Sequence, residues 1–159
     1  MPPLPEQYRG PGLVDLQVNG YAGVDFNGEP GGWTVAEFRR AVAAMRARGV
    51  VACLPALMTD AAEAMVARAR RYGELLAAAP DLAEAMPRLH IEGPFLSPDD
   101  GPRGAHPRRH CLVPAEAADL LWRIRDASGG RVALVTLAPE LPGALELVAR
   151  LAEAGVCVA

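Results

Sequence analysis

Residues 90–95 of this 159-residue chain read HIEGPF, and residues 104–107 read GAHP. The segment 88–91 predicts a short β-strand, which the glycine and proline after Glu92 end before a long polar loop. In an α/β protein, an acid at the carboxyl end of a strand faces the region where ligands bind. The segment therefore predicts an α/β fold with a candidate site at Glu92.

Strand and helix patterns alternate along the rest of the chain. Short apolar segments predict strands at 13–18, 50–54, 88–91, 132–137 and 156–159. Four amphipathic helical patterns lie between them, and they begin at Thr34, near Asp60, at Pro114 and near Pro142. This alternation predicts parallel strands with right-handed crossovers. A complete (β/α)8 barrel of the TIM type takes about 250 residues, so about four βα units predict a partial barrel.

The helix starts and apolar faces can be predicted in more detail. Thr34 with Glu37, and Asp60 with Glu63, have the spacing of a capping box. Residues at steps of three and four form one apolar stripe on each helix, which we expect to be buried. The stripes contain Val35, Phe38, Val42 and Met45; Met65, Ala69, Tyr72 and Leu76; Ala117, Leu121 and Ile124; and Leu145, Val148 and Leu151.

Composition limits the classes of protein to which the chain can belong. Hydrophobic residues make up 51%, charged residues 22%, and the formal net charge is −3, which is typical of a globular protein. This balance predicts neither a nucleic-acid partner nor a membrane partner. Cys53, Cys111 and Cys157 lack CxxC spacing, which argues against a disulfide framework or a structural zinc site. With no apolar run of about 20 residues, the prediction is a cytoplasmic protein.

The chain is predicted to be one barrel domain, 1–159, with an irregular N-terminal segment at 1–10 and an active-site loop at 93–113. Loops of that length are usually functional. In the first strand, Val14, Leu16 and Val18 are expected to pack under helices, while Gln17 and Asn19 share the opposite face. Polar residues on a buried parallel strand either line a site or satisfy backbone groups at the strand end.

The segments 11–20 and 90–107 together resemble the N-acetylglucosamine-6-phosphate deacetylases of the amidohydrolase superfamily, in the N-terminal half of their barrel. Many amidohydrolases have a metal-binding His-x-His where this chain has Gln17-Val18-Asn19. Amides are poor zinc ligands, so at most one metal position remains. A Gln-x-Asn pattern occurs among the deacetylases, which supports the narrower resemblance.

The resemblance implies roles for individual residues. Glu92 would be the carboxylate ligand of one divalent metal ion, for which the resemblance implies zinc, although pairing with Arg88 or Arg103 at the sheet edge is the structural alternative. Ala105 and His106 would bind the sugar substrate. Gln17 and Asn19 would line the vacated metal position, and His90 is expected to be a buried structural residue.

The implied activity is hydrolysis of N-acetylglucosamine 6-phosphate to glucosamine 6-phosphate and acetate. In the family a Gly-His pair follows the strand at 155–159, and the catalytic aspartate lies farther on, so no catalytic residue is expected on this chain. The chain is therefore expected to be incomplete and inactive alone. The alternative is a non-catalytic half-barrel whose exposed edges pair with another copy as a homo-oligomer. A metal-independent enzyme with His90 or His106 as base is the third reading, and no nucleophile motif supports it.

Overall fold

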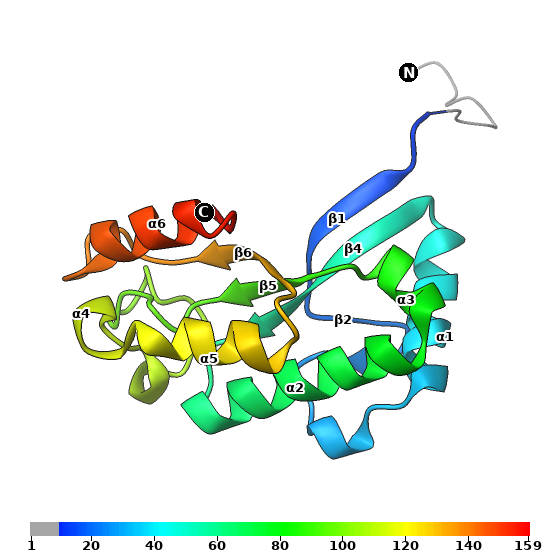
Figure 1. The fold of residues 1–159 in the computed structure, drawn as a ribbon, viewed down its shortest axis with the longest axis horizontal. Helices are drawn as coiled ribbons and strands as arrows, with labels where there is room; N and C mark the ends of the chain where they lie inside the picture. The colour runs from blue at the N-terminus through cyan, green and yellow to red at the C-terminus, as the bar shows by residue number, and fades with distance from the viewer. Residues whose placement is uncertain (1–9) are drawn as a thin grey trace.

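The computed structural model describes residues 10–159, so most of the predicted irregular segment lies outside the described residues. Five strands form one sheet in the order β1-β4-β5-β6-β7, and every neighbouring pair is parallel (Figure 1). Their bounds are Leu13–Val18, Val50–Met58, Leu89–Glu92, Val132–Thr136 and Cys157–Val158. Sequential order and parallel pairing confirm the predicted partial barrel.

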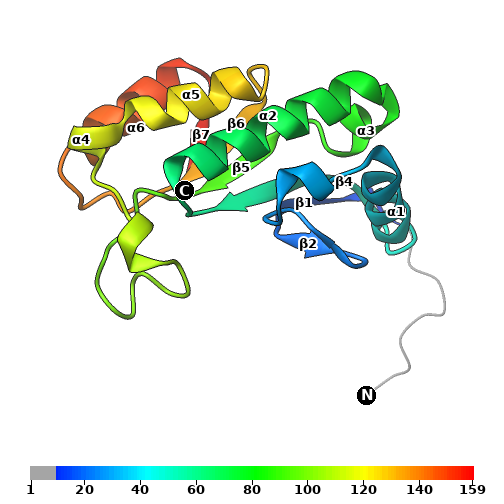
Figure 2. The same cartoon turned by 90° about the horizontal axis from the view of Figure 1, so that it is seen from below.

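Helices connect these strands as expected for βα units (Figure 2). The helix α2 packs along α5, and α1 and α3 contact β4. The α-helices are α1 (Val35–Arg46), α2 (Ala62–Ala78), α3 (Pro80–Ala85), α4 (Pro114–Ala117), α5 (Asp119–Ala127) and α6 (Ala144–Glu153). Among residues 10–159, no helix has both the length and the apolarity to cross a membrane.

Several short elements were not predicted. They are the antiparallel hairpin of β2 (Gly20–Tyr21) and β3 (Val24–Asp25), the helix α3, and the 3-10 turns η1 (Pro30–Gly32) and η2 (Arg108–His110). Elements of two to six residues contain too few positions to show a period of 2 or 3.6. The helix predicted from Pro114 is also divided into α4 and α5.

One of the two predicted capping boxes is confirmed. At α1, the Thr34 hydroxyl accepts from the Glu37 N–H at 3.2 Å, and the Glu37 carboxylate accepts from the Thr34 N–H at 3.0 Å. The prediction for Asp60 is wrong, because α2 begins after Ala61 and has no side-chain cap. Asp60 instead pairs with the buried Arg68 at 2.8 Å and accepts from the Ala61 N–H at 2.7 Å, so it lies one residue too early to cap α2.

Most predicted apolar stripes are buried, but three residues that were predicted to be buried are exposed. Leu145 is 71% exposed, whereas Ala144, Leu147 and Leu151 are buried, because α6 packs on the rest of the molecule through the face that contains these three residues. Val14 and Leu16 are also more than half exposed. Strand β1 is the edge of the sheet and makes its main contacts with β4, so no helix covers them. Val18 is buried as expected.

The side chain of Asn27 completes the hydrogen bonding of β4. Strand β1 pairs with β4 as far as Pro55, and β4 continues to Met58. The Asn27 amide then donates to Ala56 O at 2.9 Å and accepts from the Met58 N–H at 2.7 Å. Asn27 therefore satisfies backbone groups that a neighbouring strand would otherwise pair.

Candidate active site at the carboxyl ends of the strands

A pocket of about 370 Å³ opens where β4, β5 and β6 end and where the chain leaves β1. Ligand pockets commonly fall in this size range, and barrel active sites lie at this end of the strands. Its lining includes Asn19, Met58, Glu92, Leu96, Pro102, Arg103, Gly104, Ala105, His106 and Thr136. The strands thus bring the segment around residue 19, the end of β5 and the loop after it into one hollow.

Glu92 is held in place from three sides. It is the last residue of β5 and lies in register with Met58 on β4 and Thr136 on β6. The buried Thr59 donates from its hydroxyl to Glu92 O at 3.0 Å. The next residue, Gly93, has φ +86° and donates its N–H to Thr136 O at 2.9 Å. A Cβ at Gly93 would overlap Thr59 Oγ1, so glycine is required at the turn that points Glu92 into the pocket.

The Glu92 carboxylate and the His106 imidazole face each other in the pocket. Glu92 Oε1 and His106 Nε2 lie 3.6 Å apart, beyond ordinary hydrogen-bond distance, and both side chains are largely buried. Glu92 Oε2 and His106 Nδ1 are buried and have no hydrogen-bond partner. Burial of an unpaired carboxylate oxygen is costly, so these two atoms indicate a place for a cation or a polar ligand.

The structural alternative for Glu92 is wrong. Within residues 10–159, the only ion-pair contact of Glu92 is with His106, and neither Arg88 nor Arg103 pairs with it. Arg103 pairs with Asp100 and donates to the backbone oxygen of His106 at 2.8 Å. Arg103 therefore holds the turn that carries Ala105 and His106 against the pocket.

The two polar residues of β1 and its end have different positions. Asn19 lines the pocket. Gln17 is exposed and is not among the lining residues, and its backbone N–H donates to Asp15 Oδ1 at 3.1 Å. Asn19, Glu92, Ala105 and His106 are thus brought together, and Gln17 is not.

His90 is a buried residue with both ring nitrogens hydrogen bonded. Nδ1 lies 3.0 Å from Leu16 O on β1, and Nε2 lies 2.8 Å from Thr136 Oγ1 on β6. Burial lowers the pKa of His90. Both nitrogens already have partners, so this geometry argues against the reading in which His90 is a catalytic base.

Comparison with known proteins places the chain among enzymes of one class, although no protein-family model matches it. The bovine N-acetylglucosamine-6-phosphate deacetylase is 34% identical over 158 residues, covering 93% of this chain and 35% of the bovine protein. An N-acetylgalactosamine-6-phosphate deacetylase from Shewanella is 36% identical over 129 residues, covering 81% of this chain and 30% of that protein.

Solved structures give the same result. A variant of the Mycobacterium smegmatis N-acetylglucosamine-6-phosphate deacetylase, in complex with N-acetylglucosamine 6-phosphate, superposes with a TM-score of 0.77 at 33% identity. The alignment covers 93% of this chain and 35% of that chain. This chain is related to the N-acetylglucosamine-6-phosphate deacetylases. It spans about a third of the length of the curated relatives that it matches.

In this deacetylase-related chain, several lining residues were not predicted. Thr136, Met58 and Leu96 line the pocket, and so does Arg103, which was named above as a partner for Glu92. Thr136 ends β6 and Met58 ends β4. For Thr136, the position at the carboxyl end of a predicted strand could have indicated that it lines the site. Strand β4 was predicted to end at residue 54, so Met58 could not be recognised as the last residue of a strand.

The donor groups of the pocket suit a metal ion in part. The unpartnered Glu92 Oε2 is an appropriate ligand atom for a divalent cation. Among residues 10–159, however, no group of three or more His, Cys, Asp or Glu side chains is positioned to hold an ion. The described residues therefore fit one ligand of such a site and do not form a complete one.

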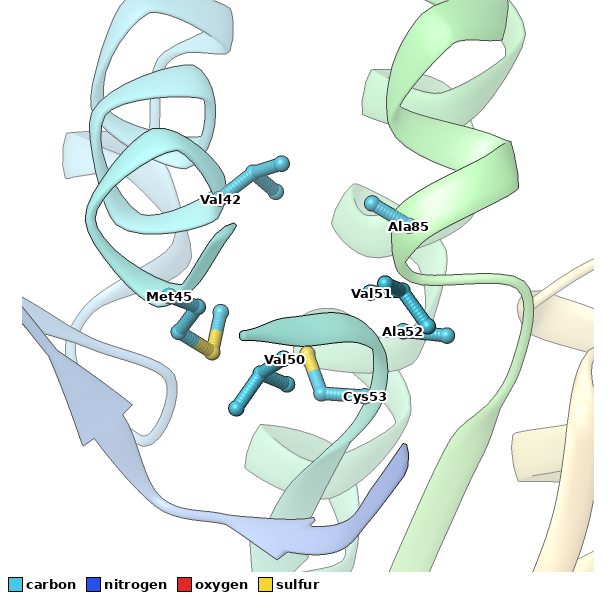
Figure 3. A pocket seen from close by; sticks show the side chains of 7 residues that line it. All are labelled: Val42, Met45, Val50, Val51, Ala52, Cys53 and Ala85. Carbon is cyan, nitrogen blue, oxygen red and sulfur yellow. The ribbon is translucent and has the colours of Figure 1, made fainter. Parts of the chain in front are cut away.

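A second hollow lies at the opposite, amino end of β4, between α1 and α3 (Figure 3). Its lining is entirely apolar or thiol: Val42, Met45, Val50, Val51, Ala52, Cys53 and Ala85. It is too tight to admit a water molecule, and burial raises the pKa of the Cys53 thiol to about 12. It is a packing gap beneath the helices and offers no reactive group.

Proposed function

We propose that this chain supplies part of the active site of a metal-dependent deacetylase that hydrolyses N-acetylglucosamine 6-phosphate to glucosamine 6-phosphate and acetate. The observation that carries the proposal is the buried, unpaired Glu92 carboxylate beside His106 at the carboxyl ends of the strands. The names of the relatives support it, and the Mycobacterium smegmatis relative was solved with this sugar phosphate bound.

Five residues of the pocket have a role in this proposal. Glu92 would hold one divalent ion, for which we propose zinc, and such an ion polarises a carbonyl and lowers the pKa of a bound water. The His106 ring and the backbone of Ala105 would bind the sugar, and Asn19 would line the region beside the ion. Arg103 keeps the turn of His106 in place through its bond to His106 O.

The described residues predict weak metal binding and no turnover by this chain alone. A catalytic zinc site uses three protein ligands, whereas the pocket offers Glu92 and at most the neighbouring His106. No side chain of the pocket is assigned the general acid or base that would move the proton during hydrolysis. We therefore propose that the chain binds substrate but needs further residues for activity.

The test combines calorimetric titration with Zn²⁺, titration with the sugar phosphate followed by NMR, and an acetate-release assay on the purified chain. Glu92→Gln keeps the shape of the side chain but removes its charge, and it should abolish the weak zinc binding. Glu140→Gln changes an exposed acid and serves as the matched control. Sugar binding should shift the resonances of His106 and Asn19.

Four results would contradict parts of the proposal. Equal zinc binding by the Glu92→Gln and Glu140→Gln proteins would remove Glu92 from the site, and absence of sugar binding would remove the substrate. Stoichiometric zinc that resists chelators, or robust turnover by the chain alone, would show that further ligands are unnecessary. Because one relative is named for the galactosamine epimer, the titration should include both N-acetylated sugar phosphates.

An exposed apolar surface supports a second candidate function, self-association of a half-barrel. Leu13, Val14 and Leu16 of β1 and Val51 of β4 are each about half exposed or more, and we refer to these four residues as the β1 patch. An unpaired strand edge favours pairing with another chain, and such pairing would also cover these apolar side chains. In this alternative a second copy would cover the β1 patch.

A cytoplasmic location stays a prediction from composition.

A further inference from the structure

His90 and Thr136 form a hydrogen-bonded pair that has no role in the reaction proposed above. His90 is 1% exposed, and each ring nitrogen has one partner. Nδ1 lies 3.0 Å from the backbone oxygen of Leu16, and Nε2 lies 2.8 Å from the hydroxyl oxygen of Thr136. The ring therefore spans from β1 to β6, across the inner side of the curled sheet.

These partners determine where the protons lie. A carbonyl oxygen can only accept, so the hydrogen bond to Leu16 O requires a hydrogen on Nδ1. In a neutral imidazole, Nε2 then has a lone pair and must accept from the Thr136 hydroxyl. The histidine ion pairs found in residues 10–159 involve His106 and His110, so no carboxylate pairs with a charged His90.

This arrangement gives Thr136 a defined polarity toward the pocket. A threonine hydroxyl has one hydrogen and two lone pairs, and the hydrogen is committed to His90. Thr136 lines the pocket and lies in register with Glu92 on the neighbouring strand. It can therefore only accept hydrogen bonds from a molecule in the pocket.

We propose that Thr136 is a further ligand-binding residue, which accepts a hydrogen bond from an N–H or O–H group of the amino sugar beside Glu92. His90 is the positioning residue that sets the direction of this hydroxyl. The inference deepens the proposed function and rests on it. It predicts that the pocket prefers a ligand donor at this position over a ligand acceptor.

The first experiment determines the tautomer of His90 directly. Long-range ¹H–¹⁵N correlation spectra of the wild-type chain should show a hydrogen on Nδ1 and no hydrogen on Nε2. In Thr136→Val the Nε2 resonance should move because its hydrogen bond is lost, and in Thr136→Ser it should stay close to the wild-type position. A wild-type His90 with hydrogen on Nε2 would overturn the inference whatever the chain binds.

The second experiment measures binding of N-acetylglucosamine 6-phosphate to the same three proteins. Thr136→Val should weaken binding about tenfold, while Thr136→Ser should retain it. When the titration is followed by NMR, only the resonances of folded protein are measured. A loss of stability in the valine variant therefore does not change the measured affinity. Equal affinity of wild type and Thr136→Val would overturn the inference but leave the proposed function intact. Absence of binding by the wild type would overturn both.

Discussion

Gly93 shows how one residue controls the geometry of the pocket. Its φ of +86° turns the chain immediately after Glu92, and its lack of a side chain lets the Thr59 hydroxyl reach Glu92 O. The same residue donates its N–H to β6. The HIEGPF segment therefore needs glycine for a conformational reason and a steric reason together, and both act on the orientation of the carboxylate.

Gly93→Ala should lower the free energy of unfolding by about 2–4 kcal/mol, because the left-handed conformation costs an alanine about 1–2 kcal/mol and the new Cβ overlaps Thr59. Gly101→Ala is the matched control, since Gly101 also has positive φ, +98°, but nothing lies near its Cβ position. It should lose only the conformational part. Urea denaturation measures both, and equal losses would contradict the steric argument.

Cys53 should be far less reactive than Cys157. Burial raises the pKa of the Cys53 thiol from its ordinary value near 9 to about 12, whereas Cys157 is exposed. Between these two pH values the unfolded chain loses the Cys53 proton and the folded chain keeps it. The free energy of unfolding should therefore fall as pH rises through this window.

Alkylation at pH 8 and pH 10 checks the Cys53 prediction. In the folded protein, mass spectrometry should find modification of Cys157 at both pH values and of Cys53 at neither. In urea, where the Cys53 thiol ionises normally, both cysteines should react. Modification of Cys53 as fast as Cys157 under native conditions would mean that Cys53 is not buried as described.

At the scale of elements, β4 depends on a side chain for part of its pairing. Its last residues pair with β5 on one side, and Asn27 takes the place of a strand on the other. Met58, which ends this stretch, lines the pocket. Asn27 therefore supports the wall of the pocket, although it is not itself a lining residue.

Asn27→Ala should lower the free energy of unfolding by about 1–3 kcal/mol, because it leaves Ala56 O and the Met58 N–H without partners. Asn27→Asp keeps the acceptor for Met58 but sets an oxygen against Ala56 O, so it should also destabilise the protein. Gln17→Ala is the control, since Gln17 is exposed. Thermal denaturation compares the three, and a loss no larger than that of Gln17→Ala would contradict this role of Asn27.

At the scale of the whole molecule, the curled sheet leaves β1 with one neighbouring strand and exposes the β1 patch. If a second copy covers this surface, sedimentation velocity of the wild-type chain should show association that increases with concentration. Leu16→Lys should weaken the association, because it places a charge within the patch. Leu145→Lys, at a leucine that is 71% exposed on α6, should not. A wild-type chain that stays monomeric at every concentration would exclude self-association through the β1 patch.

The elements that could be predicted from the sequence are those whose pattern is local. The stripe of Phe38, Val42 and Met45, the box of Thr34 with Glu37, and the strand at 13–18 all appear in the structure as predicted. Periodicity and capping are properties of neighbouring residues, so a single segment contains enough information to predict them. The position of Glu92 at the end of a parallel strand followed from the same kind of pattern.

The features that could not be predicted from the sequence depend on contacts between distant segments. Whether Val14 and Leu16 are covered depends on what packs on β1, and the face that α6 buries depends on how the helix packs on its neighbours. The approach of His106 to Glu92, the role of Asn27 beside β4, and the hydrogen bond from Thr136 to His90 join residues 14 to 46 positions apart. Burial and hydrogen bonding are satisfied in three dimensions, and a linear pattern does not specify which partners meet.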